Sequence, residues 1–115
     1  MSVTLSKIIP SVQIPNAAAA SPGLYACPAN TKVQIKKLTF TNNDSSAHVV
    51  TIHLVASAGT AGVTNIITKT ASIPAAGVYE AFEAEGHVLL PTDFITAFAD
   101  AASQVTCHGS GIVVV

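Results

Sequence analysis

The stretch that decides the fold is LYACPANTKVQIKKLTFTN, residues 24–42. A short apolar run meets a Pro-Ala-Asn-Thr turn, and the long segment Lys32–Thr41 follows it. Two pairs of apolar residues, each pair two positions apart, occupy this segment: Val33 and Ile35, then Leu38 and Phe40. The adjacent lysines Lys36 and Lys37 separate the pairs, so the segment carries two apolar registers.

Two interpretations of this segment stay open. Side chains alternate faces along a strand, so a regular strand would place the two pairs on opposite faces. An extra residue near Lys36 and Lys37, a β-bulge, would bring all four apolar side chains onto the core side and bend the strand. Alternatively, the strand is regular and buried on both faces, one against the core and one against a neighbouring subunit.

The rest of the chain repeats the period of two between Gly, Pro, Asn and Asp turns. The expected strands are Ser11–Ile14 at an edge, Gly23–Cys27, Lys32–Thr41, His48–Ala56, Ile66–Ile73, Val78–Glu83, Val88–Leu90, Phe94–Asp100 and Gln104–Val115. We expect His48–Ala56 to pair back on Lys32–Thr41 as a hairpin. The pattern predicts an all-β fold, a single-domain antiparallel β-sandwich of jelly-roll or Ig-like type with about eight strands.

Two segments with helical residues are assigned otherwise. Pro15–Gly23 contains four alanines but is bracketed by prolines, which predicts a loop or one frayed helical turn. The segment TDFITAFADAAS, residues 92–103, alternates in hydrophobicity and follows a turn, which favours a strand over a helix. The chain ends on three valines, which predicts a terminal strand held in a sheet.

The length of 115 residues predicts one domain. We divide the chain into an N-terminal arm or edge segment, residues 1–21, and a β-sandwich domain, residues 22–115. No apolar run approaches the roughly 20 residues that a membrane helix needs. The N-terminal MSVTLSKIIPSVQIP lacks a continuous apolar core, and we interpret it as mature protein made in a cytoplasm rather than a signal peptide.

The composition is low in charge, with 10% charged and 50% hydrophobic residues. Soluble domains usually carry about 25% charged residues. Either Ser, Thr and Asn cover the surface, or other subunits cover much of it, and we favour the second interpretation. Arginine is absent and the only adjacent basic pair is Lys36 and Lys37, which argues against nucleic-acid binding.

The thiols and imidazoles do not form a recognisable metal motif. Cys27 and Cys107 lie 80 positions apart, and a reducing compartment favours two free, half-buried thiols. His48 and His53 would face opposite sides of one strand, as would Cys107 and its neighbour His108. We expect surface or edge histidines, His87 included, rather than a zinc site.

Paired carboxylates can hydrolyse glycosidic bonds, and five acidic residues are candidates for this role: Glu80, Glu83, Glu85, Asp93 and Asp100. The glutamates are also typical of the wet face of a half-exposed strand. There is no Trp, and only Tyr25 and Tyr79 are available to stack on a sugar. No GxSxG elbow or phosphate loop is present. The sequence therefore assigns no catalytic, cofactor-binding or metal residue and predicts that the protein is not an enzyme.

The isolated lysines, Lys7, Lys32, Lys36, Lys37 and Lys69, are interpreted as solvated charges or as protection of strand edges.

Two long stretches carry a resemblance. LYACPANTKVQIKKLTFTNNDSSAHVVTIHLVASAGTAGVTNII (residues 24–67) resembles the opening half, and GHVLLPTDFITAFADAASQVTCHGSGIVV (residues 86–114) the closing half, of small β-sandwich structural proteins of tailed bacteriophages. The resemblance covers about residues 22–115. It is one of pattern and carries over no functional residue.

The resemblance implies a non-enzymatic virion protein, made in the host bacterial cytoplasm, without cofactors, nucleic acid or membrane. The role it favours is a capsid decoration or cement protein that binds major capsid protein subunits as a homo-oligomer, with a trimer favoured. The alternatives are a tail, head-fibre or baseplate-associated β-sandwich module, or a carbohydrate-binding module.

Overall fold

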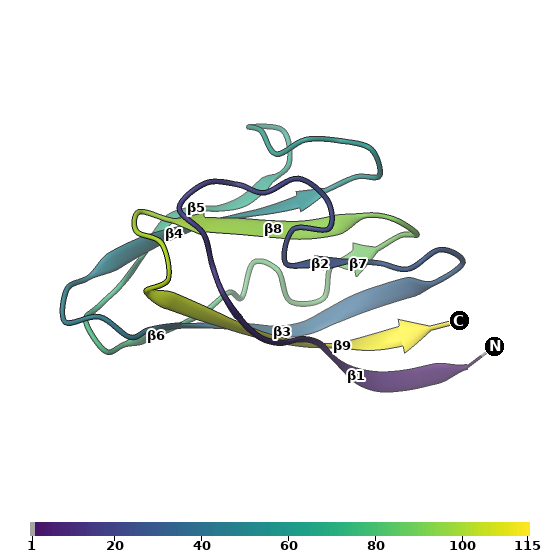
Figure 1. Cartoon of the computed structure of the whole chain (residues 1–115). Coiled ribbons are helices and arrows are strands. Elements are labelled where there is room, and N and C mark those ends of the chain that lie inside the picture. The colour runs from purple at the N-terminus through teal and green to yellow at the C-terminus, as the bar shows by residue number, and fades with distance from the viewer. Residues whose placement is uncertain (1) are drawn as a thin grey trace.

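The computed structural model describes residues 2–115 and is built from two antiparallel sheets (Figure 1). Its nine strands are β1 (Val3–Gln13), β2 (Tyr25–Ala26), β3 (Lys32–Asn42), β4 (His48–Val55), β5 (Ile66–Ile73), β6 (Val78–Glu80), β7 (Val88–Leu89), β8 (Phe94–Ala99) and β9 (Val105–Val114). No helix in this part of the chain is long and apolar enough to cross a membrane. The predicted all-β sandwich is confirmed.

The strand order identifies the type of sandwich. One sheet has the order β1-β9-β3-β6, with β7 also paired to β3, and the other has the order β2-β8-β4-β5. Because β6 and β7 pair with successive parts of β3, they act as one interrupted strand. The two sheets then hold eight strands in jelly-roll order, so of the two predicted sandwich types the chain adopts the jelly roll.

A bulge in β3 answers the question raised by its two apolar registers. Ile35 pairs with Gly111 of β9 and Lys37 pairs with Ser110, so Lys36 is an extra residue without a partner. The four apolar side chains named above are all fully buried in β3. The bulge interpretation is therefore confirmed, and a regular strand with the two apolar pairs on opposite faces is wrong.

The predicted hairpin between β3 and β4 is wrong, because these strands lie in different sheets. The Asn42 side chain ends β3 by donating hydrogen bonds to the carbonyls of Ser46 (2.9 Å), Ile73 and Pro74 (both 3.2 Å). These bonds hold the turn that carries the chain into the other sheet. Alternation along a strand shows which face of the strand is apolar. The prediction failed because the alternation is the same whether two strands pair edge to edge in one sheet or pack face to face in two.

The first strand is longer than predicted. Instead of Ser11–Ile14, β1 spans Val3–Gln13 and forms the edge of the five-stranded sheet beside β9. Its register shifts after Ser6 and again after Ile9, which hides the period of two from the sequence. Ile8, Ile9 and Ile14 nevertheless enter the core. The division of the chain at residue 21 stays a prediction.

The outer faces of the two sheets differ. Two loops, residues 14–24 and 56–65, lie over the four-stranded sheet (Figure 1). The Ala19 N–H donates to Thr96 Oγ1 of β8 at 3.2 Å, and the Thr96 side chain is buried. The five-stranded sheet has no such cover in the described residues, so its outer face is bare.

Deletion of Lys36 tests the role of the bulge. Without the extra residue, Leu38 and Phe40 would exchange faces with their polar neighbours, since a one-residue slip turns every following side chain over. We expect the deletion variant to lack a cooperative thermal unfolding transition. The substitution Lys36→Ala keeps the residue count and should unfold within a few degrees of the wild type by circular dichroism.

A second prediction concerns Gly111 in β9. A Cβ atom there would lie 2.7 Å from the Gln34 backbone oxygen, which cannot move without breaking the sheet. We expect Gly111→Ala to destabilise the protein by about 1–3 kcal/mol, as overpacking does. Gly62→Ala is the matched control, because nothing lies within 4 Å of its added Cβ. Equal unfolding midpoints for the two variants in denaturant titrations would contradict this.

Candidate functional site

The two aspartates lie apart in the fold and serve the structure, whereas the three glutamates lie together in one segment. Asp93 accepts hydrogen bonds from the backbone N–H groups of Ser57 and Leu90, both at 3.0 Å, and holds a turn. Asp100 has a different structural role, because its side chain forms a hydrogen bond with His48. Within residues 2–115, no three His, Cys, Asp or Glu side chains are grouped to hold a metal ion.

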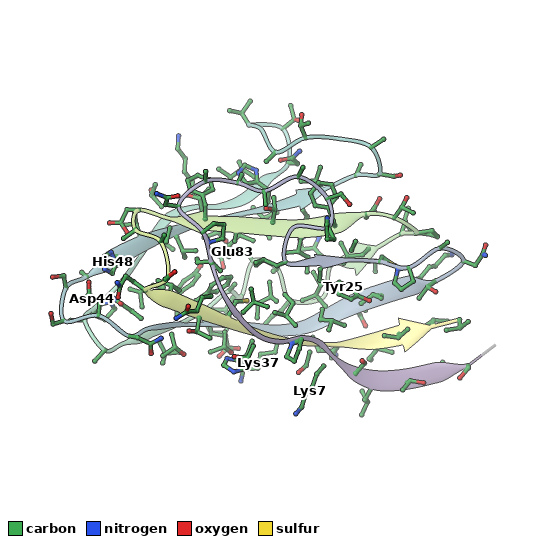
Figure 2. All side chains as sticks on the ribbon, viewed as in Figure 1. Lys7, Tyr25, Lys37, Asp44, His48 and Glu83 are labelled. Carbon is green, nitrogen blue, oxygen red and sulfur yellow. The ribbon has the colours of Figure 1, made fainter. Side chains whose placement is uncertain are left out.

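His48 lies between two carboxylates at one end of the sandwich, where Figure 2 shows it beside Asp44. Its Nε2 is 2.7 Å from Asp44 Oδ2, and its Nδ1 is 2.8 Å from Asp100 Oδ1. A doubly protonated imidazolium donates at both nitrogens, so it satisfies both carboxylates at once. The contact joins the β3–β4 turn to the end of β8.

The two carboxylates and the imidazole shift one another's titration. The hydrogen bond to Asp44, then that to Asp100, raises the pKa of His48 above 6.5. The same contact with His48 lowers the pKa of Asp44 below 3.8. Burial works to raise the pKa of Asp100, but hydrogen bonds from His48 and from the Val49 N–H outweigh it, and this pKa is lowered as well.

The stability of the protein should therefore depend on the charge of His48. Because its folded-state pKa is raised, its contribution is full below pH 6.5 and is lost as the pH rises through the raised pKa. The carboxylates contribute above pH 3.8 and lose this contribution as the pH falls through their lowered pKa values. We expect the highest thermal midpoint between these limits.

The substitution His48→Gln checks this expectation. The variant should melt below the wild type at pH 5, and the difference should shrink as the pH rises through the raised pKa of His48, because the wild type then loses its imidazolium. His108→Gln is the control, since His108 is exposed and has no carboxylate partner among the described residues. A constant difference between His48→Gln and the wild type as the pH rises through the raised pKa of His48 would contradict the charged clamp.

The prediction of surface or edge positions is wrong for His53, as it is for His48. Both His48 and His53 are buried, whereas His87 and His108 are exposed as predicted. His53 Nδ1 lies 2.8 Å from Asn65 Oδ1, and its ring stacks on Phe98 at 6.2 Å between centroids. Asn65 also accepts from the Gly62 N–H, so this cluster fixes the loop over the four-stranded sheet.

The two cysteines are free thiols, as predicted, but they are fully buried rather than half-buried. The Cys27 thiol donates to the Thr31 carbonyl oxygen at 3.2 Å. Burial raises the pKa of Cys107 to about 12, so this thiol stays protonated and unreactive. Its neighbour His108 faces the other side of the sheet, as the alternation predicted.

The three glutamates lie together in one segment. The predicted strand to Glu83 is wrong, because β6 ends at Glu80 and residues 81–86 form turns opposite the β3 bulge. We call residues 80–86 the acidic segment. A hydrogen bond with Glu80, then burial, raises the pKa of Glu85. Phe82, in the same segment, is 70% exposed.

The bare face of the five-stranded sheet carries an apolar surface that the sequence did not reveal. Leu5 of β1 pairs with Ile112 of β9, which pairs with Gln34 of β3, which in turn pairs with Val88 of β7. Paired residues of neighbouring strands share a face, so these side chains form one row across four strands. We define the apolar row as Val3, Leu5, Val88, Ile112 and Val114.

The row is open to solvent. Leu5 is 81% exposed, Val3 60% and Val88 52%, while Ile112 and Val114 are half-buried. Leu90 and Val115, at the end of the sandwich where both termini lie, are more than half exposed as well (Figure 1). Exposed apolar side chains gathered on one face of a sheet mark interaction surfaces, and here only the polar Gln34 lies between Ile112 and Val88.

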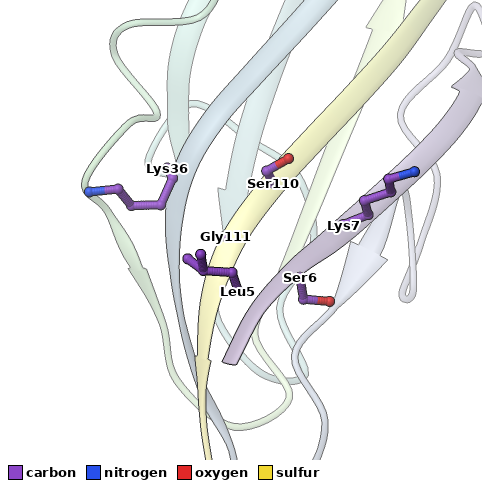
Figure 3. Close-up of a pocket in the computed structure, with 6 residues that line it drawn as sticks. All are labelled: Leu5, Ser6, Lys7, Lys36, Ser110 and Gly111. Carbon is purple, nitrogen blue, oxygen red and sulfur yellow. The ribbon is translucent and has the colours of Figure 1, made fainter. Parts of the chain in front are cut away.

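Beside the row is a shallow hollow of about 360 Å³, lined by Leu5, Ser6, Lys7, Lys36, Ser110 and Gly111. Figure 3 shows Lys36 and Lys7 on the two strands that flank β9, with Leu5 reaching toward Gly111. The hollow forms over Ser110 and Gly111 because their side chains are small. Sequence reasoning missed the row and the hollow because both depend on the register of β1, β3 and β9.

Comparisons with known proteins add little to this picture. No protein-family model matches the chain, and no curated protein matches it. A search of solved structures finds similarity to a chain in the structure of infectious bursal disease virus Gx strain, with 16% identity and a TM-score of 0.45. The match covers 97% of this chain but 31% of that chain, so this chain spans about a third of its length.

Proposed function

We propose that this chain is a non-enzymatic structural protein of a virus particle, most readily a decoration or cement protein on the head of a tailed bacteriophage. It binds major capsid protein subunits and associates with copies of itself. A trimer is the favoured assembly. The protein is located in the virion after its synthesis in the host bacterial cytoplasm.

The observation that carries the proposal is the apolar row on an uncovered sheet. A stable protein contact buries about 800 Å² on each partner, and the row with its polar rim lies on the flat face of four strands. Burying a Val or Leu side chain contributes about 1.5–3 kcal/mol relative to leaving it in water. A partner that covers the row therefore has a strong driving force to bind. An enzyme that acts through an active-site cleft would not need such an exposed apolar surface.

The fold and the sequence pattern agree with this role. Jelly rolls occur in viral capsid domains and also in lectins and cupins, so the topology is compatible with the proposal without deciding it. The resemblance in residues 22–115 to small phage structural proteins adds the phage setting. A tail-associated module would use the same surface, and imaging of the particle separates head from tail.

The experiment uses particles of the virus that encodes the chain, imaged by cryo-electron microscopy with and without added protein. We expect density for a β-sandwich on the outer shell, over contacts between capsid subunits. Purified protein should also sediment with particles that lack it. A chain that stays monomeric at high concentration and does not sediment with either heads or tails would overturn the proposal.

Substitutions in the row sharpen this test. The double variant Val3→Ser with Val88→Ser removes two exposed apolar side chains, so the fold should be unaffected while affinity for particles falls at least tenfold. Val63→Ser is the matched control, because Val63 is 88% exposed but belongs to the loop over the opposite sheet. Equal losses in the two variants would show that the row is not the contact surface.

A further inference from the structure

The hollow beside the apolar row arises from irregularities on both neighbours of β9. The register of β3 shifts at Lys36, opposite Gly111 and Ser110. The register of β1 shifts after Ser6, which also pairs with Gly111. Both irregularities therefore fall beside the small side chains of Ser110 and Gly111 in β9. At about 360 Å³, the hollow falls in the lower range of ligand-binding pockets and can admit one aromatic side chain.

The charged residues that line the hollow, Lys7 and Lys36, are both basic. Strands β1, β3 and β9 carry four of the five lysines and no carboxylate. Lys37 pairs with Glu80 at 3.7 Å, but Lys7, Lys32 and Lys36 form no ion pair within residues 2–115. Figure 2 shows Lys7 and Lys37 on the outer side of this sheet, pointing away from the core. A partner for this surface should combine an apolar side chain with carboxylates.

The chain itself presents that combination in its acidic segment. Phe82 is 70% exposed, and Glu83 beside it is exposed and accepts a hydrogen bond from the Tyr79 hydroxyl. The other carboxylates are engaged, since Asp44 and Asp100 bind His48 and Asp93 holds a turn. The acidic segment is thus where the chain concentrates negative charge around an exposed aromatic ring.

Crowding of the carboxylates supports the need for an external cation. Glu80 and Glu85 lie close enough that the hydrogen bond between them is the largest cause of the raised pKa of Glu85. Lys37 only partly offsets this repulsion. A lysine from another molecule would lower the electrostatic cost of keeping all three glutamates ionised.

We infer that the hollow receives the acidic segment of a second copy of this chain, with Phe82 of that copy packing on Leu5 and its Glu83 pairing with Lys36. This inference rests on the proposed function, because it supplies the surfaces for the self-association proposed there. The remaining apolar residues near the termini, such as Val3 and Leu90, stay free for the virion partner.

The position of the two surfaces makes the contact intermolecular. The acidic segment runs along β3 at the bulge, where the Gly86 N–H donates to the Ile35 carbonyl oxygen at 2.7 Å. In that position Phe82 remains largely exposed and does not fill the hollow of its own chain. Two different patches meeting head to tail close into a ring, such as a trimer, whereas reciprocal use by two copies gives a dimer. The mass of the assembly distinguishes these.

The first test measures mass by light scattering from micromolar to millimolar concentration. We expect the wild type to associate, and Leu5→Ser and Phe82→Ser each to raise the dissociation constant at least tenfold. Val63→Ser should associate like the wild type. Association that is unchanged in both variants, or a wild type that is monomeric throughout, overturns the inference.

The second test exchanges charges. Lys36→Glu and Glu83→Lys should each weaken association, and the double variant should regain it because the pair is restored in the opposite sense. Lys69→Glu, on an edge strand of the other sheet, is the control and should have no effect. Failure of the double variant to recover, with circular dichroism showing an intact fold, contradicts the Lys36–Glu83 pair.

Cross-linking keeps the test independent of folding losses. Mixed subunits carrying Leu5→Cys and Phe82→Cys should form a disulfide-linked pair under mild oxidation, because the native thiols are buried and will not compete. Particle sedimentation is measured on Phe82→Ser, because Phe82 lies outside the apolar row proposed to bind the particle. Loss of self-association with particle binding retained supports this inference separately from the proposed function, and particle binding without any mixed cross-link rejects it alone.

Discussion

The extra residue at Lys36 is the constraint on which the rest of the structure depends. It lets one strand present Val33, Ile35, Leu38 and Phe40 to a single core although their spacing changes register. It also interrupts the opposite neighbour of β3, so that β6 and β7 are separated by the acidic segment. A single insertion in one ladder thereby shapes the core, the surface hollow and the exposed turn beside it.

The sandwich divides its two outer faces between different tasks. On the four-stranded sheet, His53 and Asn65 fix one loop and Thr96 receives the other, so this face is closed by the chain itself. On the five-stranded sheet the chain leaves a flat surface with an apolar row and unpaired lysines. Of the two outer faces, this one is therefore left uncovered within residues 2–115.

Polar contacts, rather than extra apolar burial, fix the ends of the sandwich. Asn42 binds three carbonyl groups where the chain changes sheets, and His48 joins the next turn to β8. Jelly-roll connections cross between layers, so their turns cannot rely on a ladder of hydrogen bonds. Side chains that bind several backbone or carboxylate groups at once take over that role, which explains why a histidine is buried at this position.

The sequence by itself determined the period of two and the approximate position of nearly every strand. It also determined that the C-terminal valines form a strand held in a sheet and that both cysteines are free. Alternation encodes which face of a strand is apolar, and Gly, Pro and Asn encode where strands end. It reduced the irregular β3 to two interpretations, of which the bulge is confirmed. It also indicated an excess of apolar surface, but not its location.

Only the tertiary structure decided which strands pair and what gathers on each face. Backbone hydrogen-bond groups are the same in every strand, so the sequence could not place β3 and β4 in different sheets. Shifts of register in β1 obscured its length, and the apolar row exists only once Leu5, Ile112 and Val88 are aligned across strands. The carboxylates of His48 come from residues 4 and 52 positions away, a proximity that folding alone creates.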